Sequence, residues 1–553
     1  MTPALPRLAA RTNIAAAAAG LRQRPKQLRL RVYRGNSQSQ QPASQLHTTS
    51  IDNKGFLSTL LQTAKTKDPV TTHWHGQPTH EERPDLMRKN EVTPGITKAE
   101  YEARRQSLVS ALPKGSTAFV FSSGVFFVSP HVFHGFRQHS DFYYLTGWNE
   151  PDSVAVIQQN SHASRGYTMT MFVNPKDPEK EVWEGPRNGL SAAVSVFGAD
   201  EAWPIDEFTR RTADLVAQIA QKPADEGYVY ADLDSQNNMW VSPQCKELKR
   251  LLKRDNLGPR IRRLSPSVQK LRLIKSDAEV ALMREAGRVS GLAFAEIIRE
   301  SAPGMSESML QSVFEHACKM ALVGKSTSDG GGGVAVDRSA LTRPAYVPVF
   351  ASGEHALCMH YVLNSASMRG GDLVLVDAGA EYASYASDIT RTFPVNGRFA
   401  DAQRDLYSAV LSVQQQMISL CNVDSGYSLN EIHRRSTQVM ATELKQIGFH
   451  ASSRDIDDRL YPHHISHYLG MDVHDTVDMS RSQLLKKNMV VTVEPGIYVP
   501  YDDRFPKAFQ GMGIRIEDDI VVGQTVDGIQ NLTALAPKTV EEIEACAEAR
   551  QAN

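Results

Sequence analysis

The sequence is poor in cysteine and has no long apolar run. Its five cysteines stand far apart, with no CxxC pair: Cys245, Cys318, Cys358, Cys421 and Cys546. Because they are scattered and odd in number, they exclude a disulfide framework and a thiolate zinc knuckle. No apolar stretch reaches the roughly 18 residues that a membrane-spanning helix requires. We therefore expect reduced thiols and no membrane span.

The chain also lacks an excess of either charge. It has 61 Lys and Arg residues against 62 Asp and Glu residues, a formal net charge of -1. Without a basic excess there is no broad positive field for phosphates, so we expect no nucleic-acid partner. With 41% hydrophobic and 22% charged residues, the 553 residues predict a globular protein of two or more domains.

Acidic residues are absent from the first 51 positions, which contain seven arginines and one lysine. An Arg-rich, acid-free segment is typical of a mitochondrial presequence, and a disordered basic tail is the alternative. In either case residues 1–51 should stand outside the fold. Residues 52–91 are polar and rich in Thr, His and Pro, and they predict a linker or extended arm.

The rest of the chain predicts two domains. Between residues 92 and 264, apolar runs such as TAFVFSS and YTMTMFV alternate with helical patterns, which indicates an α/β domain. A second domain is expected over residues 265–545. Near its start, Ser276 and Glu279 have the spacing of a capping box before a helical pattern. A glycine-rich stretch at 324–345 predicts a flexible loop.

Four acids border apolar strands in the second domain. The strand predicted in GDLVLVDAG ends at Asp377, and the strand predicted in NMVVTVEPG ends at Glu494. Each acid stands two residues before a glycine. Each strand precedes another that carries an acid, Asp388 in ASDITRTF and Glu517 in GIRIEDDIVV. In the last strand, Arg515 and Glu517 should share one face. The repeated pattern predicts an internal duplication with two facing carboxylate pairs.

Buried carboxylates repel one another and lose hydration, so four of them require positive charge. Two divalent cations would supply it, and the stretch HHISHYLGMDVHD, His463 to Asp475, offers an imidazole ligand. Oxygen ligands with one imidazole suit Mn(II), with Co(II) or Zn(II) as alternatives. Two such ions would activate water and polarise a carbonyl, which predicts hydrolysis. The competing interpretations are acids that face water and an adventitious histidine patch.

Together these motifs resemble aminopeptidase P, a family of the pita-bread metallopeptidases, through VDAGAEYASYASDITRTFPV, HHISHYLGMDVHD, VVTVEPGIYV and GIRIEDDIVV. HSDFYYLTGWNEPDSVAVI, residues 139–157, resembles the first domain of that family. The upstream GQPTHEERPDLMRKNEVTPGITKAEYEARR resembles the mitochondrial type, which includes the intermediate-cleaving peptidase. The resemblance implies an α/β (α+β) protein: a smaller α/β N-terminal domain, then a pita-bread catalytic domain.

The resemblance also implies a metal site. Asp388 and Glu517 would bridge two metal ions. Asp377 would complete the coordination of one ion, and His467 and Glu494 that of the other. Glu494 would in addition hold and deprotonate the bridging water.

Other residues match positions around the family's site. His360, His463 and His474 would line the substrate channel and steady the tetrahedral intermediate. Arg515 would support the ligand shell. His464 departs from the family, which commonly has glycine there, and its side chain is expected to narrow the channel.

Two aspartates of the same stretch, Asp472 and Asp475, have no assigned chemistry. They either orient the neighbouring histidines or serve the structure only.

The activity implied by the resemblance is metal-dependent removal of a single N-terminal residue, such as Tyr, Leu or Phe, from imported mitochondrial proteins. Xaa-Pro peptides would also be cleaved. The implied protein is a homodimer in the matrix or on the matrix face of the inner membrane. The alternatives within enzymes are a plain Xaa-Pro aminopeptidase and a prolidase-like dipeptidase. A pita-bread binding module and a non-metal hydrolase of this fold are further alternatives, but both typically lack metal ligands that this chain retains.

Overall fold

The computed structural model describes residues 75–223, 225–233, 242–325 and 335–549. The expected presequence lies outside the described residues, as do part of the expected linker and part of the glycine-rich stretch. No helix among the described residues combines the length and apolarity needed to cross a lipid bilayer.

The first domain is built on one six-stranded sheet, in the order β10-β9-β3-β6-β7-β8. Strands β3, β6 and β7 pair antiparallel, whereas β10, β9 and β8 join through parallel pairs. The elements are β1 (Glu91–Thr93), β2 (Ile96–Thr97), α2 (Lys98–Ala111), β3 (Thr117–Phe121), β4 (Phe127–Ser129), β5 (Val132–Phe133), α3 (Ser140–Thr146), β6 (Val154–Gln159), β7 (Tyr167–Val173), α4 (Pro178–Glu184), α5 (Gly189–Ser195), β8 (Glu201–Pro204), α6 (Phe208–Ala220), β9 (Val229–Tyr230), α7 (Pro243–Arg254) and β10 (Ile261–Arg262).

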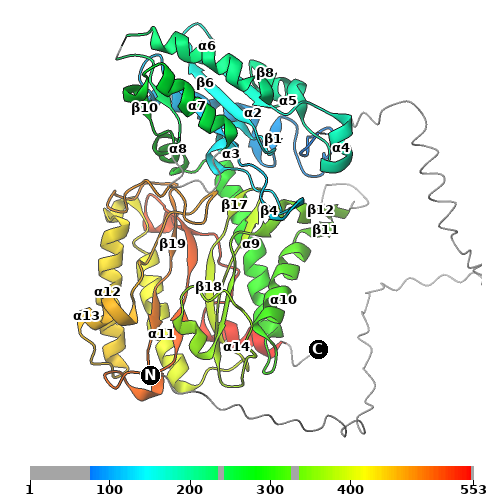
Figure 1. Cartoon of the computed structure of the whole chain (residues 1–553). Coiled ribbons are helices and arrows are strands. Elements are labelled where there is room, and N and C mark those ends of the chain that lie inside the picture. The colour runs from blue at the N-terminus through cyan, green and yellow to red at the C-terminus, as the bar shows by residue number, and fades with distance from the viewer. Residues whose placement is uncertain (1–74, 224, 234–241, 326–334, 550–553) are drawn as a thin grey trace, which may run out of the picture. The chain divides into compact units, whose positions relative to one another are not determined.

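Alternation along the strands of this sheet divides its side chains between two cores. Phe119 and Val156 pack with α6 and α7 in one cluster, and Figure 1 shows these two helices together beside the sheet. Their neighbours Ala118 and Ile157 face the other way, into a cluster with residues of α2 and α3. Both faces are therefore covered, as the alternating pattern predicts.

Among the described residues, the second domain contains five small antiparallel sheets with bordering helices. Its elements are α8 (Ser265–Arg272), α9 (Asp277–Glu300), α10 (Glu307–Met320), β11 (Val323–Lys325), β12 (Ala335–Asp337), β13 (Thr342–Pro344), β14 (Val349–Ser352), β15 (Leu373–Ala378), β16 (Ala380–Tyr382), β17 (Tyr385–Ala386), β18 (Ile389–Pro394), α11 (Asp401–Ile418), α12 (Leu429–Gln446), α13 (Ser453–Asp455), β19 (Val490–Val493), β20 (Gly496–Tyr498), β21 (Gly513–Arg515), β22 (Asp518–Val521), β23 (Gln530–Asn531) and α14 (Val540–Glu548).

The long helix α9 starts where the sequence predicts it. The Ser276 hydroxyl accepts a hydrogen bond from the Glu279 amide, and the Glu279 carboxylate accepts one from the Ser276 amide. This reciprocal pair satisfies two amides that the first helical turn leaves free. The predicted capping box is confirmed.

The prediction of one continuous strand in GIRIEDDIVV is wrong. The stretch GIRIEDDIVV forms two strands, β21 and β22, with Ile516 and Glu517 between them. β21 pairs with β20, whereas β22 pairs with β19. The chain changes partner at this point, so Glu517 lies in the step between two sheets. Apolar alternation alone carries no signal for such a change of partner.

Candidate metal centre and active site

Four carboxylates meet where two antiparallel strand pairs end. Asp377 belongs to β15 and faces Thr390 of β18, while Asp388 directly precedes β18. In the second pair, Glu494 directly follows β19 and Glu517 directly precedes β22. A hydrogen bond from the Glu517 amide to the Thr390 carbonyl oxygen, 3.0 Å long, joins the two pairs.

The glycine two residues after each strand-end acid permits a close approach. A Cβ on Gly379 would lie 1.9 Å from the carbonyl oxygen of Ser387, the residue before Asp388. A Cβ on Gly496 would lie 2.8 Å from Nε2 of His463. Any larger residue would therefore push an acid or a histidine away from the cluster.

Three of the predicted ligands are close enough to share one ion. Asp388, His467 and Glu517 are buried and offer ligand atoms that all lie within 4.8 Å of one another. His467 Nε2 is 3.4 Å from Asp388 Oδ2 and 3.7 Å from Glu494 Oε1. Its Nδ1 lies 3.1 Å from the Tyr468 carbonyl oxygen, which can only accept a hydrogen bond. That bond assigns a proton to Nδ1 and leaves Nε2, on the side of the acids, as the atom that could bind a cation.

Asp377, the fourth acid, is held from two sides. The Tyr346 hydroxyl lies 2.6 Å from Asp377 Oδ1 and 2.5 Å from Asp388 Oδ1, so it spans the first carboxylate pair. Arg515 Nη2 donates to Asp377 Oδ2 at 2.5 Å. Asp377 is thus joined to the cluster through a phenol and a guanidinium.

Arg515 also reaches the second carboxylate pair. Its Nε donates to the Thr390 hydroxyl at 3.0 Å, and that hydroxyl donates to Glu517 Oε2 at 2.6 Å. Its Nη1 donates to the Tyr498 hydroxyl at 2.7 Å. The buried guanidinium therefore fixes groups on both sides of the cluster.

Burial and crowding raise the pKa of three of the four acids. Burial, and then the charge of Asp388, raises the pKa of Glu517 well above its usual range. Burial also raises the pKa of Glu494 to about 7 and that of Asp377 above its usual range. Burial opposes the charge of Asp388 as well, but the hydrogen bond and charge of His467 keep its pKa low.

His467 completes the charge pattern. Burial disfavours its cation, yet the hydrogen bond to Asp388 and the charge of Glu494 raise its pKa to about 9. His467 is therefore positively charged at neutral pH beside the acids. Four carboxylates and one imidazole are a donor set that fits hard divalent cations.

His463 lies between Glu494 of the cluster and the side chain of Tyr498. Its Nε2 is 3.1 Å from the Tyr498 hydroxyl, and its Nδ1 is 3.8 Å from Glu494 Oε2. Burial, followed by the charge of Arg515, lowers its pKa to about 3. The imidazole is therefore neutral at physiological pH and can donate or accept a hydrogen bond beside the acids.

The other predicted histidines lie differently. The exposed ring of His474 stands edge-on to that of His467, with centroids 4.5 Å apart. His360 is also exposed and interacts electrostatically with His474. The ring of His464, in contrast, stacks on His433 at 4.6 Å and meets Asn430 at 3.2 Å, so it lies against α12. The side chain of His464 is therefore packed against α12. The expectation that it narrows the channel stays a prediction.

Sequence reasoning missed the neutral groups that hold the acids. Thr390 stands two residues after Asp388, and Thr492 two residues before Glu494, so strand alternation places each threonine on the face of its acid. That spacing was available as a signal. Tyr346 lies in the connection between β13 and β14, where no periodic pattern indicates its direction.

Family models match both domains. The model for the metallopeptidase family M24 matches residues 281–524, and the model for the aminopeptidase P N-terminal domain matches residues 101–222.

Curated relatives match nearly the whole chain. Intermediate cleaving peptidase 55 of Saccharomyces cerevisiae is 37% identical over 478 residues, which are 85% of this chain and 88% of the yeast protein. Xaa-Pro aminopeptidase 3 of Homo sapiens is 36% identical over 500 residues, 86% of this chain and 91% of the human protein.

Solved structures agree. Icp55 from Saccharomyces cerevisiae, lacking its N-terminal 58 residues, matches with a TM-score of 0.72 and 34% identity, covering 84% of this chain and all of that one. Aminopeptidase P from Escherichia coli matches with a TM-score of 0.71 and 32% identity, covering 83% of this chain and 100% of that one.

The predicted fold class and the resemblance to the aminopeptidase P family are confirmed. The chain belongs to metallopeptidase family M24, and within it to the two-domain metallo-aminopeptidases of the aminopeptidase P type.

Proposed function

We propose that the carboxylate cluster holds two divalent cations, with Mn(II) as the first candidate and Co(II) or Zn(II) as alternatives. The proposed ligands are Asp377, Asp388, His467, Glu494 and Glu517. Asp388 and Glu517 would contribute to both ions. The observation that carries this proposal is the convergence of four acids, three of them beside one imidazole, with pKa values that disfavour four negative charges.

Bound cations of this kind supply Lewis acidity and lower the pKa of a coordinated water. Glu494, at the edge of the cluster, is the base that takes the proton of the attacking water and passes it to the leaving amine. His463 and His474 lie beside the cluster, and His360 near His474; these three would bind the scissile carbonyl and the developing charge. Arg515 keeps the ligands in place from behind.

The reaction is the removal of a single N-terminal residue from peptides and proteins. The names of the relatives, intermediate cleaving peptidase and Xaa-Pro aminopeptidase, support two substrate types. We favour bulky first residues such as Tyr, Leu and Phe, exposed when presequences are removed, with Xaa-Pro peptides also cleaved. A plain Xaa-Pro aminopeptidase is the second candidate, and it rests on the Escherichia coli relative.

The cellular setting follows from the same relatives and from the N-terminal composition. Residues 1–51 have no acid and seven arginines, and the Arabidopsis thaliana relative is named as mitochondrial. These observations support a mitochondrial protein, in the matrix or on the matrix face of the inner membrane. We further propose that it acts as a homodimer.

Protein N-termini in cells lacking this protein test the processing role. Mitochondrial proteins should then begin one residue earlier, with Tyr, Leu or Phe at the added position. Cells that carry Glu494→Gln instead of the normal chain should show the same longer termini. Unchanged mitochondrial termini, together with hydrolysis of Xaa-Pro peptides alone, would leave the plain Xaa-Pro aminopeptidase as the function.

A further inference from the structure

Two of the four histidines in the HHISHYLGMDVHD stretch, His467 and His474, are held in different ways. His467 is fixed by β19: its amide donates to the Thr492 hydroxyl at 3.1 Å, and its carbonyl oxygen accepts from the Thr492 amide at 3.0 Å. His474 lies at the far end of the loop of residues 468–475, which we call the 468–475 loop. No strand holds His474 directly, so its position depends on whatever fixes that loop.

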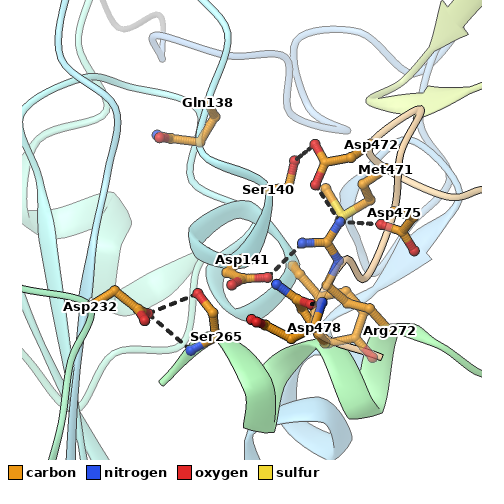
Figure 2. A network of polar contacts seen from close by, with 12 residues as sticks. Gln138, Ser140, Asp141, Asp232, Ser265, Arg272, Met471, Asp472, Asp475 and Asp478 are labelled. Atoms are coloured by element: carbon orange, nitrogen blue, oxygen red, sulfur yellow. Dashed lines mark hydrogen bonds and ion pairs between the residues drawn. The ribbon is translucent and has the colours of Figure 1, made fainter. Parts of the chain in front are cut away.

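Strands β17 and β19 hold the start of this loop through backbone bonds to Gly470 and Leu469. The end of the loop that carries His474 is held by a buried arginine at the end of α8. Arg272 is 4% exposed. Its Nη1 donates to Asp141 Oδ1 of α3 at 2.6 Å, and its Nη2 donates to Asp472 Oδ2 at 2.6 Å and also contacts the Asp475 carboxylate. Figure 2 shows this guanidinium between α3, which belongs to the N-terminal domain, and the two aspartates that flank His474.

Further polar contacts tighten the same loop. Lys275 Nζ donates to Asp475 Oδ2 at 3.0 Å, and both side chains are 1% exposed. Arg137, just before α3, donates to the Met471 carbonyl oxygen at 2.6 Å. The Ser140 hydroxyl donates to Asp472 Oδ1 at 2.6 Å (Figure 2). The side-chain donors that bind Asp472 and Met471 thus come from α8 and from the segment around α3.

The loop is also packed closely against Asp475. A Cβ on Gly470 would lie 2.5 Å from Asp475 Oδ2, and the Asp475 amide donates to the Tyr468 carbonyl oxygen at 2.9 Å. Because His474 directly precedes Asp475, a shift of the backbone at Asp475 would also move the His474 ring. The ring would then leave its place 4.5 Å from that of His467.

A buried ionic network of this size is a poor device for stability alone. Desolvating the charges costs about as much as their attraction returns, whereas the geometry of a planar guanidinium specifies where each carboxylate must lie. Only an arginine can reach Asp141 with one nitrogen and the loop aspartates with another. A lysine offers a single point charge.

We propose that Arg272 is a positioning residue that sets His474 in the active site and makes turnover depend on the N-terminal domain. It acts through Asp472 and Asp475 on one side and is itself anchored by Asp141 on the other. This assignment rests on the proposed substrate-binding role of His474. The sequence left open whether the two loop aspartates orient the histidines, and the network assigns them that role.

The test compares Arg272→Met and Asp141→Asn with Arg105→Met. Arg105 is an equally buried arginine whose partners, the Tyr167 hydroxyl at 2.7 Å and the Leu145 carbonyl oxygen at 2.8 Å, both belong to the N-terminal domain. Arg272→Met should lower kcat by about 10²-fold, because a displacement of about 1 Å has that effect on a catalytic group. Bound metal should remain near the wild-type amount, since β19 holds His467 independently.

Asp141→Asn should lower kcat less, in the same direction, and Arg105→Met should lower Tm without lowering kcat. The double variant Arg272→Met/His474→Ala should be no slower than His474→Ala, because both changes remove one function. Additive losses in the double variant, or an equal loss of kcat in Arg105→Met, would show that Arg272 serves only stability and would overturn the proposal.

A readout without turnover separates this proposal from the proposed function. Hydrogen exchange of the loop amides should quicken in Arg272→Met and Asp141→Asn, and stay at the wild-type rate in Arg105→Met. If the wild-type protein proves inactive on all peptides, the proposed function fails, and loop exchange still decides the structural role of Arg272. Unchanged exchange in Arg272→Met would overturn the positioning role regardless of activity.

Discussion

Asp388 and Glu517 stand at the centre of the carboxylate cluster, each within reach of the imidazole of His467. A ligand that serves two cations cannot be removed without weakening both. We therefore predict that Asp388→Ala and Glu517→Ala each abolish peptidase activity and metal binding together. Metal content by mass spectrometry and turnover on a Tyr-initiated peptide measure the two effects.

The exposed acid Asp503 offers a matched control. Asp503→Ala removes a carboxylate of the same type and should change neither quantity. Two bound ions and full turnover in Asp388→Ala or Glu517→Ala would contradict the shared-ligand assignment.

The proposed function divides the histidines of the site into one metal ligand and three substrate-binding groups. Replacing His360, His463 or His474 by Ala should lower kcat by about 10²-fold while metal content stays near normal, because these groups stabilise charge in the transition state. His467→Ala should lose metal as well. Metal loss in His474→Ala, with His467→Ala fully loaded, would mean that the wrong histidine was chosen as the ligand.

Among single residues, the four acids of the cluster could be predicted because strand ends and glycines mark them locally. Tyr346 and Arg272 could not, because each meets the site through contacts that span long stretches of sequence. The bond between Arg272 and Asp475 joins positions 203 residues apart. No local pattern carries that information.

At the scale of elements, the two strand-end glycines should fail differently when each is changed to Ala. In Gly379→Ala the new Cβ would meet the Ser387 carbonyl oxygen at 1.9 Å, a backbone atom that cannot rotate away. The strands β15 and β18 must then separate near Asp388, so we predict loss of metal and a lower Tm.

In Gly496→Ala the Cβ would meet the Nε2 of His463 at 2.8 Å, a side-chain atom that can turn aside. This variant should retain metal and lose turnover. Calorimetry, metal analysis and kcat distinguish the two outcomes, and an identical phenotype for both variants would contradict the account of the strand ends.

Apolar runs sufficed to predict β15 and β19, since each is an uninterrupted buried strand between polar turns. The start of α9 was predictable because a capping box is a local motif. The division of GIRIEDDIVV into β21 and β22 was not, because it depends on which strand lies alongside. Strand pairing is set by the tertiary structure and not by propensity.

For the molecule as a whole, stability should depend on pH and on metal together. In the cation-free fold the pKa of Glu494 is about 7 against its usual 4.5, so the folded chain binds more protons than the unfolded chain in that window. Its contribution to the free energy of unfolding therefore falls as the pH rises from about 4.5 to about 7.

His467, with a pKa of about 9 against 6.5, contributes stability that is full below pH 6.5 and is lost as the pH rises through 9. Both signs agree, so Tm in the presence of a chelator should fall from pH 6 to pH 8. Cations replace these protons, and the gain in Tm on adding Mn(II) should grow over the same range. Scanning calorimetry at pH 6, 7 and 8 measures it, and a gain that shrinks with rising pH would contradict the metal-site assignment.

The two-domain plan was predictable from alternating strands and helices and from the resemblance of both halves to one family. The contact between the halves was not. Asp141 and Asp472 are joined by Arg272 only once both domains have folded, and the sequence presents the three as unrelated charges.

The most direct test of the central claim is the product released from a peptide. Purified protein loaded with Mn(II) should be incubated with peptides that differ only in their first two residues, and every product identified by mass. We predict release of one free amino acid per peptide, fastest for Tyr, Phe or Leu in the first position. Peptides with an acetylated N-terminus should remain intact. Release of dipeptides, internal cleavage, or no hydrolysis by protein with both cations bound would contradict a single-residue aminopeptidase.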